Sequence, residues 1–278
     1  MLEKVQYRNH LGEVVSFGEN GLFVNENDLR DFLWSYTNKN NRISAFGKGV
    51  VKKTLQVIIA CDSETEGIAK RNALFETCEK DVLAKKHGRI FIGDYYMRCY
   101  VVGSKKTEYL RNNRFMKVKL TIATEYPTWI REKLIPFRMS NSPFAPGVGG
   151  QNHDYPYDYF FDYGSDIATN AVKNEDFASS NFRIVIYGSC INPEIYIAGH
   201  VYNVNTEIAA NEYLVINSGE KTIELVRSNG EKVNCFNSRN RDSYVFERIP
   251  PGASNVMWDG SFGFDVTLLE ERSEPRWT

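Results

Sequence analysis

Short runs in which apolar and polar residues alternate fill most of this 278-residue chain, and such runs predict β-strands. The clearest set follows residue 181, where turn residues separate four apolar runs: 182–187, 194–198, 201–204 and 213–216. Further on, residues 221–226 and 231–236 flank an Asn-Gly pair, which predicts a type I′ hairpin. Residues 243–246, 256–258 and 262–269 predict further strands. Many short strands with turns between them predict a β-sandwich or jelly roll for the C-terminal half.

The N-terminal half has the same alternation, with one helical interruption. Residues 4–24 predict a hairpin and a third strand, and residues 95–125 predict a long hairpin. Residues 29–36 predict a strand whose aromatic side chains share one face, because those side chains occupy every second position. The polar run 37–42 predicts a loop.

Residues 63–88 predict the one clear helix of the chain. Ser63 can cap its first turn, and Glu66 three residues later completes a capping box. Apolar residues at helical spacing predict a stripe that packs on a sheet, formed by Ile68, Leu74, Phe75, Cys78 and Val82. Gly88 suits the left-handed residue that often ends a helix.

Composition and charge change sharply near the middle of the chain. Residues 133–152 hold three prolines and three glycines, a composition typical of a linker. Residues 1–138 carry 24 lysines and arginines against 16 acids, whereas residues 139–278 carry 10 against 19. We therefore expect two domains with different surfaces. The predicted division is an N-terminal domain at 1–135, a linker at 136–152 and a C-terminal β-sandwich domain at 153–278.

The cellular setting is constrained by two features of the sequence. No apolar run is long enough to span a bilayer, and the first residues lack a charged-then-apolar signal segment, so we expect a chain made in a cytoplasm. The five cysteines are widely spaced, and their odd number favours free thiols in a reducing compartment.

Residues 154–164 form the most unusual stretch of the chain. Aromatic residues occupy every second position: Tyr155, Tyr157, Tyr159, Phe161 and Tyr163. Aspartates lie on the opposite side of an extended strand: Asp154, Asp158 and Asp162. One hypothesis is an edge strand that packs over the sandwich, and the other is a surface for sugar or Ca²⁺. The candidate contacts to a glycan or a partner protein are Tyr155, Tyr157, Tyr159, Asp158 and Asp162.

No arrangement of residues in the sequence predicts catalysis, a metal site or a cofactor. The four histidines lie in separate segments, and the carboxylate pair Asp259 and Asp265 is of a kind expected in any chain with 35 acids. The predicted long hairpin is basic, with residues Lys105, Lys106, Arg111, Arg114, Lys117 and Lys119. Two hypotheses fit this charge: contact with nucleic acid, or a solvated outer face whose lysines protect an exposed strand edge from mispairing. We favour the solvated edge, because no stacking aromatic residues alternate with the charges.

Seven motifs together resemble the siphophage distal tail protein family. They are LRDFLWSY (29–36), NNRIS (40–44), ATEYPTWIRE (123–132), DYPYDYFFDYG (154–164), NPEIYI (192–197), NEYLVI (211–216) and WDGSFGFDVTLLEERSEPRW (258–277). The resemblance covers nearly the whole chain. It implies a mainly β protein with one helix, a ring-forming N-terminal domain with a long hairpin, and a C-terminal galectin-like or jelly-roll sandwich.

The resemblance also implies a function. A distal tail protein is a structural hub, a homo-hexameric ring that joins the tail tube to the baseplate or tail fibre of a virion, prophage or tail-like bacteriocin. Its partners would be the tail tube protein and the tail-tip or receptor-binding proteins. No catalytic residue is implied, and neither a membrane nor specific nucleic-acid binding is expected. The alternative hypothesis is a carbohydrate-binding module that adheres to the host surface through the C-terminal sandwich.

Overall fold

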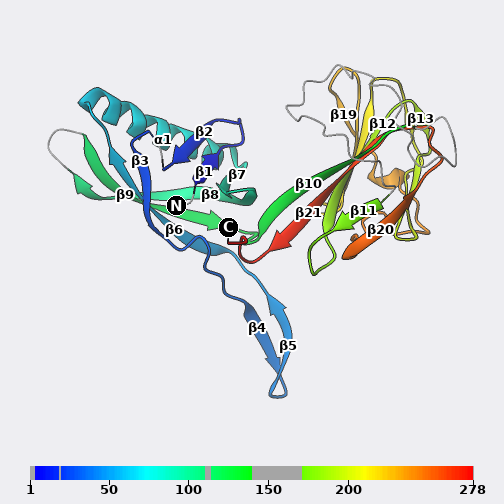
Figure 1. Ribbon diagram of the computed structural model, residues 1–278, viewed down its shortest axis with the longest axis horizontal. Helices are drawn as coiled ribbons and strands as arrows, with labels where there is room; N and C mark the ends of the chain where they lie inside the picture. The colour runs from blue at the N-terminus through cyan, green and yellow to red at the C-terminus, as the bar shows by residue number, and fades with distance from the viewer. Residues whose placement is uncertain (1–3, 19, 110–113, 140–170, 278) are drawn as a thin grey trace. The chain divides into compact units, whose positions relative to one another are not determined.

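The computed structural model describes residues 4–18, 20–109, 114–139 and 171–277, and most of these residues lie in β-strands (Figure 1). Within the described part, the chain contains a single α-helix, α1 (Glu64–Ala84). The predicted fold class, mainly β with one helix, is confirmed.

The chain divides into two compact units. The N-terminal unit comprises Met1–Arg131 and Glu271–Thr278, and the C-terminal unit comprises Glu132–Glu270. The expected division placed residues 271–278 in the C-terminal domain, whereas here they group with the N-terminal unit, and the expected domain boundaries stay a prediction. The chain returns to the N-terminal unit along β21 (Phe264–Arg272), and Arg30 then binds the last described residues. Most of the expected linker, from residue 140 onward, lies outside the described residues.

The N-terminal unit contains two antiparallel groups of strands that share one long strand. The shared strand is β8 (Tyr95–Tyr109), and the others are β1 (Val5–Arg8), β2 (Val14–Phe17), β3 (Leu22–Asn27), β6 (Val51–Ala60), β7 (Gly88–Ile92) and β9 (Phe115–Thr124). The first half of β8 pairs in the order β2-β1-β7-β8, and its second half pairs in the order β8-β9-β6-β3. The predicted hairpin near the N-terminus and the predicted long hairpin are both present.

Strand alternation builds the core of this unit. Every second residue of β6 is buried, as in Leu55, Val57 and Ile59, because successive side chains point to opposite faces. The same holds for Val118, Leu120 and Ile122 of β9. These residues join a single apolar cluster that includes Leu74 of α1, so the helix packs on the sheet as predicted.

The start of α1 agrees with its prediction, and its end does not. The Ser63 hydroxyl accepts a hydrogen bond from the Glu66 backbone N–H at 3.2 Å. The Glu66 carboxylate accepts a hydrogen bond from Lys70, and this bond, more than those from the backbone of Asp62 and Ser63, holds the pKa of Glu66 below its usual value. The helix stops at Lys85, which is the left-handed residue with φ of 54°. Gly88 instead begins β7 at a position where a Cβ would overlap the Asp81 carboxylate and the Tyr7 hydroxyl.

A buried polar cluster fixes the helix to the N-terminal hairpin. The fully buried Asp81 carboxylate accepts hydrogen bonds from the Tyr7 hydroxyl at 2.5 Å and from the His10 backbone N–H at 2.9 Å. The His10 ring Nδ1 lies 2.5 Å from the same carboxylate. Burial and the bond to Asp81 raise the pKa of Tyr7 far above its usual value, so this hydroxyl stays protonated. The cluster explains how a charged side chain occupies the buried face of α1.

The C-terminal unit is a sandwich of two antiparallel sheets. One sheet has the order β19-β18-β17-β12-β21-β10, and the other has the order β11-β20-β14-β15. The strands are β10 (Trp129–Phe137), β11 (Ala171–Asn174), β12 (Asn181–Tyr187), β14 (Glu194–Ile197), β15 (His200–Asn203), β17 (Tyr213–Asn217), β18 (Thr222–Val226), β19 (Lys232–Asn234) and β20 (Gly252–Met257). The short strands β13 (Cys190–Ile191) and β16 (Glu207–Ile208) form a separate pair.

One apolar core fills the space between these two sheets. Ile184, Leu214 and Phe264 enter it from the first sheet, and Ile195 and Val256 enter it from the second. Each of these residues is at most 1% exposed, so the sandwich closes its core without help from the other unit. The predicted β-sandwich is confirmed.

Two local predictions in the C-terminal unit are wrong. The turn at residues 227–230 has Gly230 as its left-handed residue, with φ of 84°, so it is not the predicted type I′ turn. A type I turn followed by a left-handed glycine fits this geometry. Residues 243–246 form a bend rather than a strand. Val245 and Phe246 are both buried, which the alternation of a strand does not allow.

The region from residue 28 to residue 47 also differs from its prediction. Residues 29–34 form a turn and an irregular segment, and β4 (Ser35–Lys39) pairs with β5 (Arg42–Gly47) across the run that was expected to be a loop. Asn40 and Asn41 both have positive φ, 52° and 59°, which is the type I′ geometry that closes two-residue hairpins. Asparagine adopts this conformation at low cost.

Candidate assembly surface

The hairpin β4–β5 is the most exposed element of the N-terminal unit. Its two strands form a sheet of their own, and every residue in them is exposed. Tyr36 and Phe46 lie directly opposite each other across the pair and are each 64% exposed. An isolated two-stranded hairpin is marginally stable in water. This hairpin therefore has the properties of an element that is stabilised by a partner.

The segment that leads into the hairpin is held firmly to the sheet. The buried Lys53 ammonium donates hydrogen bonds to the carbonyl oxygens of Asp28 at 3.0 Å and Asp31 at 2.5 Å. Burial lowers the pKa of Lys53, and the charges of Asp28 and Asp31 oppose this shift. Leu29 is fully buried beside them. These contacts explain why residues 29–34 do not continue as a strand.

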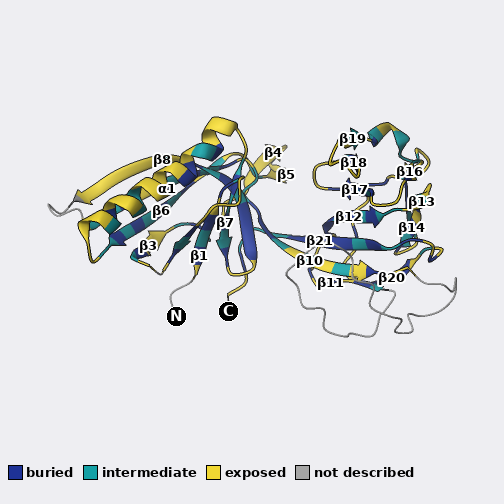
Figure 2. Cartoon of the chain, turned by 90° about the horizontal axis from the view of Figure 1, so that it is seen from above, coloured by how far each residue is buried: buried dark blue, intermediate teal, exposed yellow. Residues whose placement is uncertain are grey.

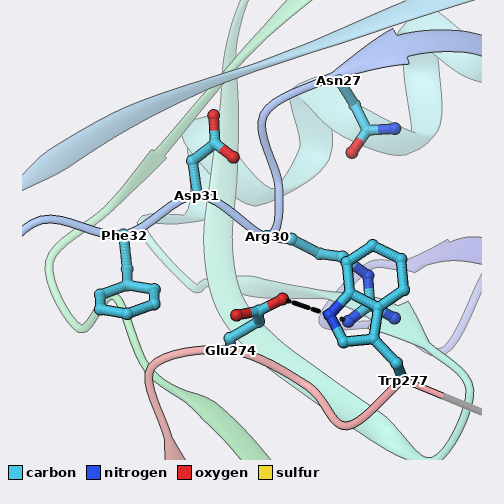
Figure 3. Close-up of a pocket in the computed structure, with 6 residues that line it drawn as sticks. All are labelled: Asn27, Arg30, Asp31, Phe32, Glu274 and Trp277. Atoms are coloured by element: carbon cyan, nitrogen blue, oxygen red, sulfur yellow. Dashed lines mark hydrogen bonds and ion pairs between the residues drawn. The ribbon is translucent and has the colours of Figure 1, made fainter.

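An open pocket of about 540 Å³ lies beside this segment. Its lining residues are Asn27, Arg30, Asp31, Phe32, Glu274 and Trp277 (Figure 3). The Arg30 guanidinium lies 3.9 Å from the centroid of the Trp277 ring and donates a hydrogen bond to the Pro275 carbonyl at 2.7 Å. The Trp277 indole N–H donates to Glu274 at 2.7 Å. The last residues of the chain thus form one wall of the pocket.

The pocket combines aromatic rings with carboxylates. Phe32 and Trp277 are 53% and 74% exposed, although both are large apolar side chains. Asp31 contributes its backbone carbonyl to the bond with Lys53, which leaves its exposed carboxylate available. Arg30 also lines the pocket, and its guanidinium lies 3.9 Å from the Glu274 carboxylate, so one cation and two carboxylates share this surface with the aromatic rings.

A second exposed apolar surface lies on α1. The predicted inward stripe is wrong in part, because Ile68, Phe75, Val82 and the neighbouring Leu83 are exposed. Figure 2 shows the exposed side of α1 in yellow. The buried positions of the helix are instead Gly67, Leu74, Thr77, Cys78 and Asp81. The two stripes are adjacent on the helix, so the real packing face is turned by about one position from the predicted face.

The basic hairpin β8–β9 is part of the sheet, and Arg111 of the predicted charge cluster lies outside the described residues. Lys105 lies opposite Lys119, and the Lys117 ammonium forms a 2.8 Å ion pair with Glu108. Lys105 and Lys106 lie on the far half of β8, which is an edge among the described strands, whereas Lys117 and Lys119 lie on β9, which pairs with both β6 and β8. The hypothesis of nucleic-acid binding stays open.

The carboxylates Asp259 and Asp265 each have a separate partner. Asp265 accepts a hydrogen bond from the Tyr187 hydroxyl at 2.7 Å, whereas Asp259 accepts bonds from Ser261 in a local turn. The aromatic stretch with Tyr155, Tyr157, Tyr159, Asp158 and Asp162 lies outside the described residues.

All five cysteines are free, as predicted, and burial raises the pKa of Cys78 to about 12. Within the described ranges, no group of His, Cys, Asp and Glu side chains could hold a metal ion, and α1 lacks the apolar length of a bilayer-spanning helix.

Comparison with known proteins gives a likeness of fold. No family model and no curated protein sequence matches the chain. The solved structure of SPP1 Dit (gp 19.1), described as a paradigm of the hub adsorption apparatus in Gram-positive infecting phages, has a TM-score of 0.59 at 12% identity. The match covers 98% of this chain and 100% of that chain.

Two structures of the phage P2 baseplate in its activated conformation are also similar. The structure with Ca has a TM-score of 0.62 at 13% identity, and the structure with Sr has a TM-score of 0.61 at 12% identity. Both matches cover 99% of this chain and 100% of the other. This chain therefore has the fold of phage hub and baseplate proteins along nearly its whole length.

Proposed function

We propose that this chain is a structural phage tail protein, the hub at the distal end of the tail that joins the tail tube to the baseplate or tail fibre. The observation that carries the proposal is the full-length likeness of fold to SPP1 Dit and to phage P2 baseplate chains. Its site of action would be the virion tail, after assembly in the bacterial host. A prophage or a tail-like bacteriocin would use the same protein in the same way.

The hub would be a homo-hexameric ring formed by the N-terminal unit. A ring supports function at a tail tip because it can match the symmetry of a tube, and closed rings leave no unpaired interface. The exposed hairpin β4–β5 and the exposed apolar side chains Phe75 and Leu83 on α1 support this unit as the source of the subunit contacts. The acidic C-terminal unit would then contact the baseplate or receptor-binding proteins.

Electron microscopy of the purified full-length chain tests this proposal. We expect ring-shaped particles with six-fold symmetry that bind one end of tubes assembled from the tail tube protein of the same phage. Particles without a ring that also fail to bind tube ends would contradict the proposed hub. Tubes of an unrelated phage serve as the control for non-specific adhesion.

The glycan hypothesis for residues 155–163 remains a prediction. If the aromatic residues pack on the sandwich, Tyr159→Ala should lower the free energy of unfolding by about 1.5–3 kcal/mol, the transfer value of a large side chain. Asp158→Asn should leave it nearly unchanged. Thermal unfolding of the full-length chain measures both variants. Unchanged stability of Tyr159→Ala together with lost binding to host cell-wall sugar would favour the carbohydrate-binding alternative.

A further inference from the structure

The tip of the hairpin β4–β5 carries positive charge that no acid among the described residues pairs with. Lys39 and Arg42 flank the turn and lie directly opposite each other in the strand register. Like charges in this position destabilise a strand pair. No acid occurs between residues 32 and 61, and neither side chain forms an ion pair with a described residue. The tip is therefore suited to an anionic partner.

The pocket beside Asp31 has the complementary chemistry. Its Asp31 carboxylate is exposed and forms no ion pair within the described part of the chain. Phe32 lines the pocket from the segment that leads into β4, whereas Glu274 and Trp277 line it from the last residues of the chain (Figure 3). Of the two carboxylates, Glu274 already lies 3.9 Å from the Arg30 guanidinium. An ammonium or guanidinium group is attracted both to the face of an aromatic ring and to a carboxylate. The pocket is therefore suited to a lysine or arginine side chain.

The walls of this pocket are already in place before a ligand binds. Lys53 holds the backbone of Asp31, and Arg30 holds the Pro275 carbonyl next to Glu274. A preorganised site loses little conformational entropy when it binds. The volume of about 540 Å³ lies within the range of binding pockets and is large enough for the side chains of a turn.

The tip cannot fill the pocket of its own chain. β4 begins at Ser35, three residues after Phe32, and the five residues of β4 place the turn about 17 Å farther away. Figure 1 shows β4 and β5 extending away from the strands of the N-terminal unit. The tip and the pocket are two different surfaces of one chain that cannot meet within it. A head-to-tail contact between copies requires such a pair of surfaces.

We propose that the pocket formed by Asp31, Phe32, Glu274 and Trp277 accepts the hairpin tip, with Lys39 and Arg42, of a second copy of this chain. Each copy then donates one tip and accepts another, which closes a ring when the rotation between copies allows it. The inference rests on the proposed ring and names the residues of one of its contacts.

Charge reversal in the full-length chain tests the contact, with sedimentation velocity as the readout. We expect Lys39→Glu combined with Arg42→Glu to weaken self-association about tenfold or more, as close charge pairs at interfaces do. Asp31→Lys should have the same effect. All three substitutions together should restore self-association to within a few-fold of the wild type, because the charges are again complementary.

The matched control is Arg241→Glu combined with Arg248→Glu. It changes the net charge of the chain by the same amount through exposed side chains of the C-terminal unit, and it should assemble like the wild type. Circular dichroism and thermal unfolding of each variant should match the wild type, because the substituted side chains are exposed. Higher salt should weaken self-association of the wild type, and it should weaken self-association of the control variant to the same extent.

The outcomes separate this inference from the proposed ring. A wild-type chain that assembles, with a tip variant that assembles equally well, overturns the pocket contact and leaves the ring standing. Failure of the triple variant to recover also overturns direct contact between tip and pocket. A tip variant that assembles normally but no longer binds another tail protein shows a different occupant and overturns the proposal. A wild-type chain that never self-associates overturns both.

Discussion

The two units of this protein differ in how many of their large apolar side chains are exposed. Of the large hydrophobic residues that are exposed in the described part of the chain, 16 belong to the N-terminal unit and 6 to the C-terminal unit. The C-terminal sandwich encloses its core between two sheets, whereas the N-terminal unit leaves apolar groups outside on β4–β5, on α1 and around the pocket. Large exposed apolar surfaces usually mark binding sites. Under the proposed function, the N-terminal unit would be the part of the molecule that assembles.

The charge of the two halves differs in the same way. The first 138 residues carry a net positive charge, and the rest of the chain carries a net negative charge. Opposite charge does not determine a fold, but it influences which surfaces associate. A basic unit that forms a ring and an acidic unit that faces other proteins would satisfy both observations.

The largest expected effect compares one phenylalanine from each unit. Phe264 is fully buried in the sandwich, so Phe264→Ala should lower the free energy of unfolding by about 3–5 kcal/mol. Phe75 is 54% exposed on α1, so Phe75→Ala should cost less than about 1 kcal/mol and instead reduce self-association. Chemical denaturation and sedimentation velocity measure the two quantities. A large stability loss in Phe75→Ala without any change in assembly would remove α1 from the candidate surface.

The second prediction concerns the polar cluster that positions α1. Asp81→Ala leaves the Tyr7 hydroxyl and the His10 N–H without their acceptor, and each buried orphaned group costs about 1–3 kcal/mol. We expect a total loss of about 2–6 kcal/mol in the free energy of unfolding by denaturant titration, using the same values. Glu79→Ala, which truncates an exposed acid on the same helix, is the control. Equal stability of the two variants would show that the cluster does not hold the helix.

The smallest expected effect concerns pH and the C-terminal unit. Burial raises the pKa of Asp265 in the folded state, while the Tyr187 hydroxyl and the charge of Arg138 oppose the shift. The folded chain therefore binds this proton more tightly than the unfolded chain, and stability falls as pH rises from the unfolded pKa through the folded pKa. Asp265→Asn should remove this part of the pH dependence and raise stability slightly at neutral pH. Thermal unfolding of the wild type and of Asp265→Asn at a series of pH values measures this difference. The same pH dependence in both proteins would contradict a raised pKa of Asp265.

The strand framework could be predicted from the sequence, whereas the candidate surface could not. Alternation identified the long hairpin and the sandwich strands, because side chains on a strand alternate between core and solvent. The same rule failed at residues 29–36, where the tertiary bonds from Lys53 overrode an aromatic alternation. Two asparagines in the left-handed conformation turned an expected loop into the hairpin β4–β5.

The face of α1 and the pocket show why tertiary partners matter. Periodicity indicated the stripe with Ile68 and Phe75, because the neighbouring stripe contains the charged Asp81. That charge is buried only because Tyr7 and His10 provide donors, and these lie more than 70 residues away in sequence. The pocket likewise joins Arg30 to the Pro275 carbonyl, 245 residues along the chain, and no local pattern marks such a contact.

The mass of the wild-type chain in solution tests the central claim most directly. Light scattering coupled to size exclusion, at high protein concentration and low salt, reports this mass without a shape assumption. We expect a species of about six times the 31.9 kDa chain, with dissociation on dilution or at high salt. A mass of one chain at every concentration would contradict assembly through the N-terminal unit.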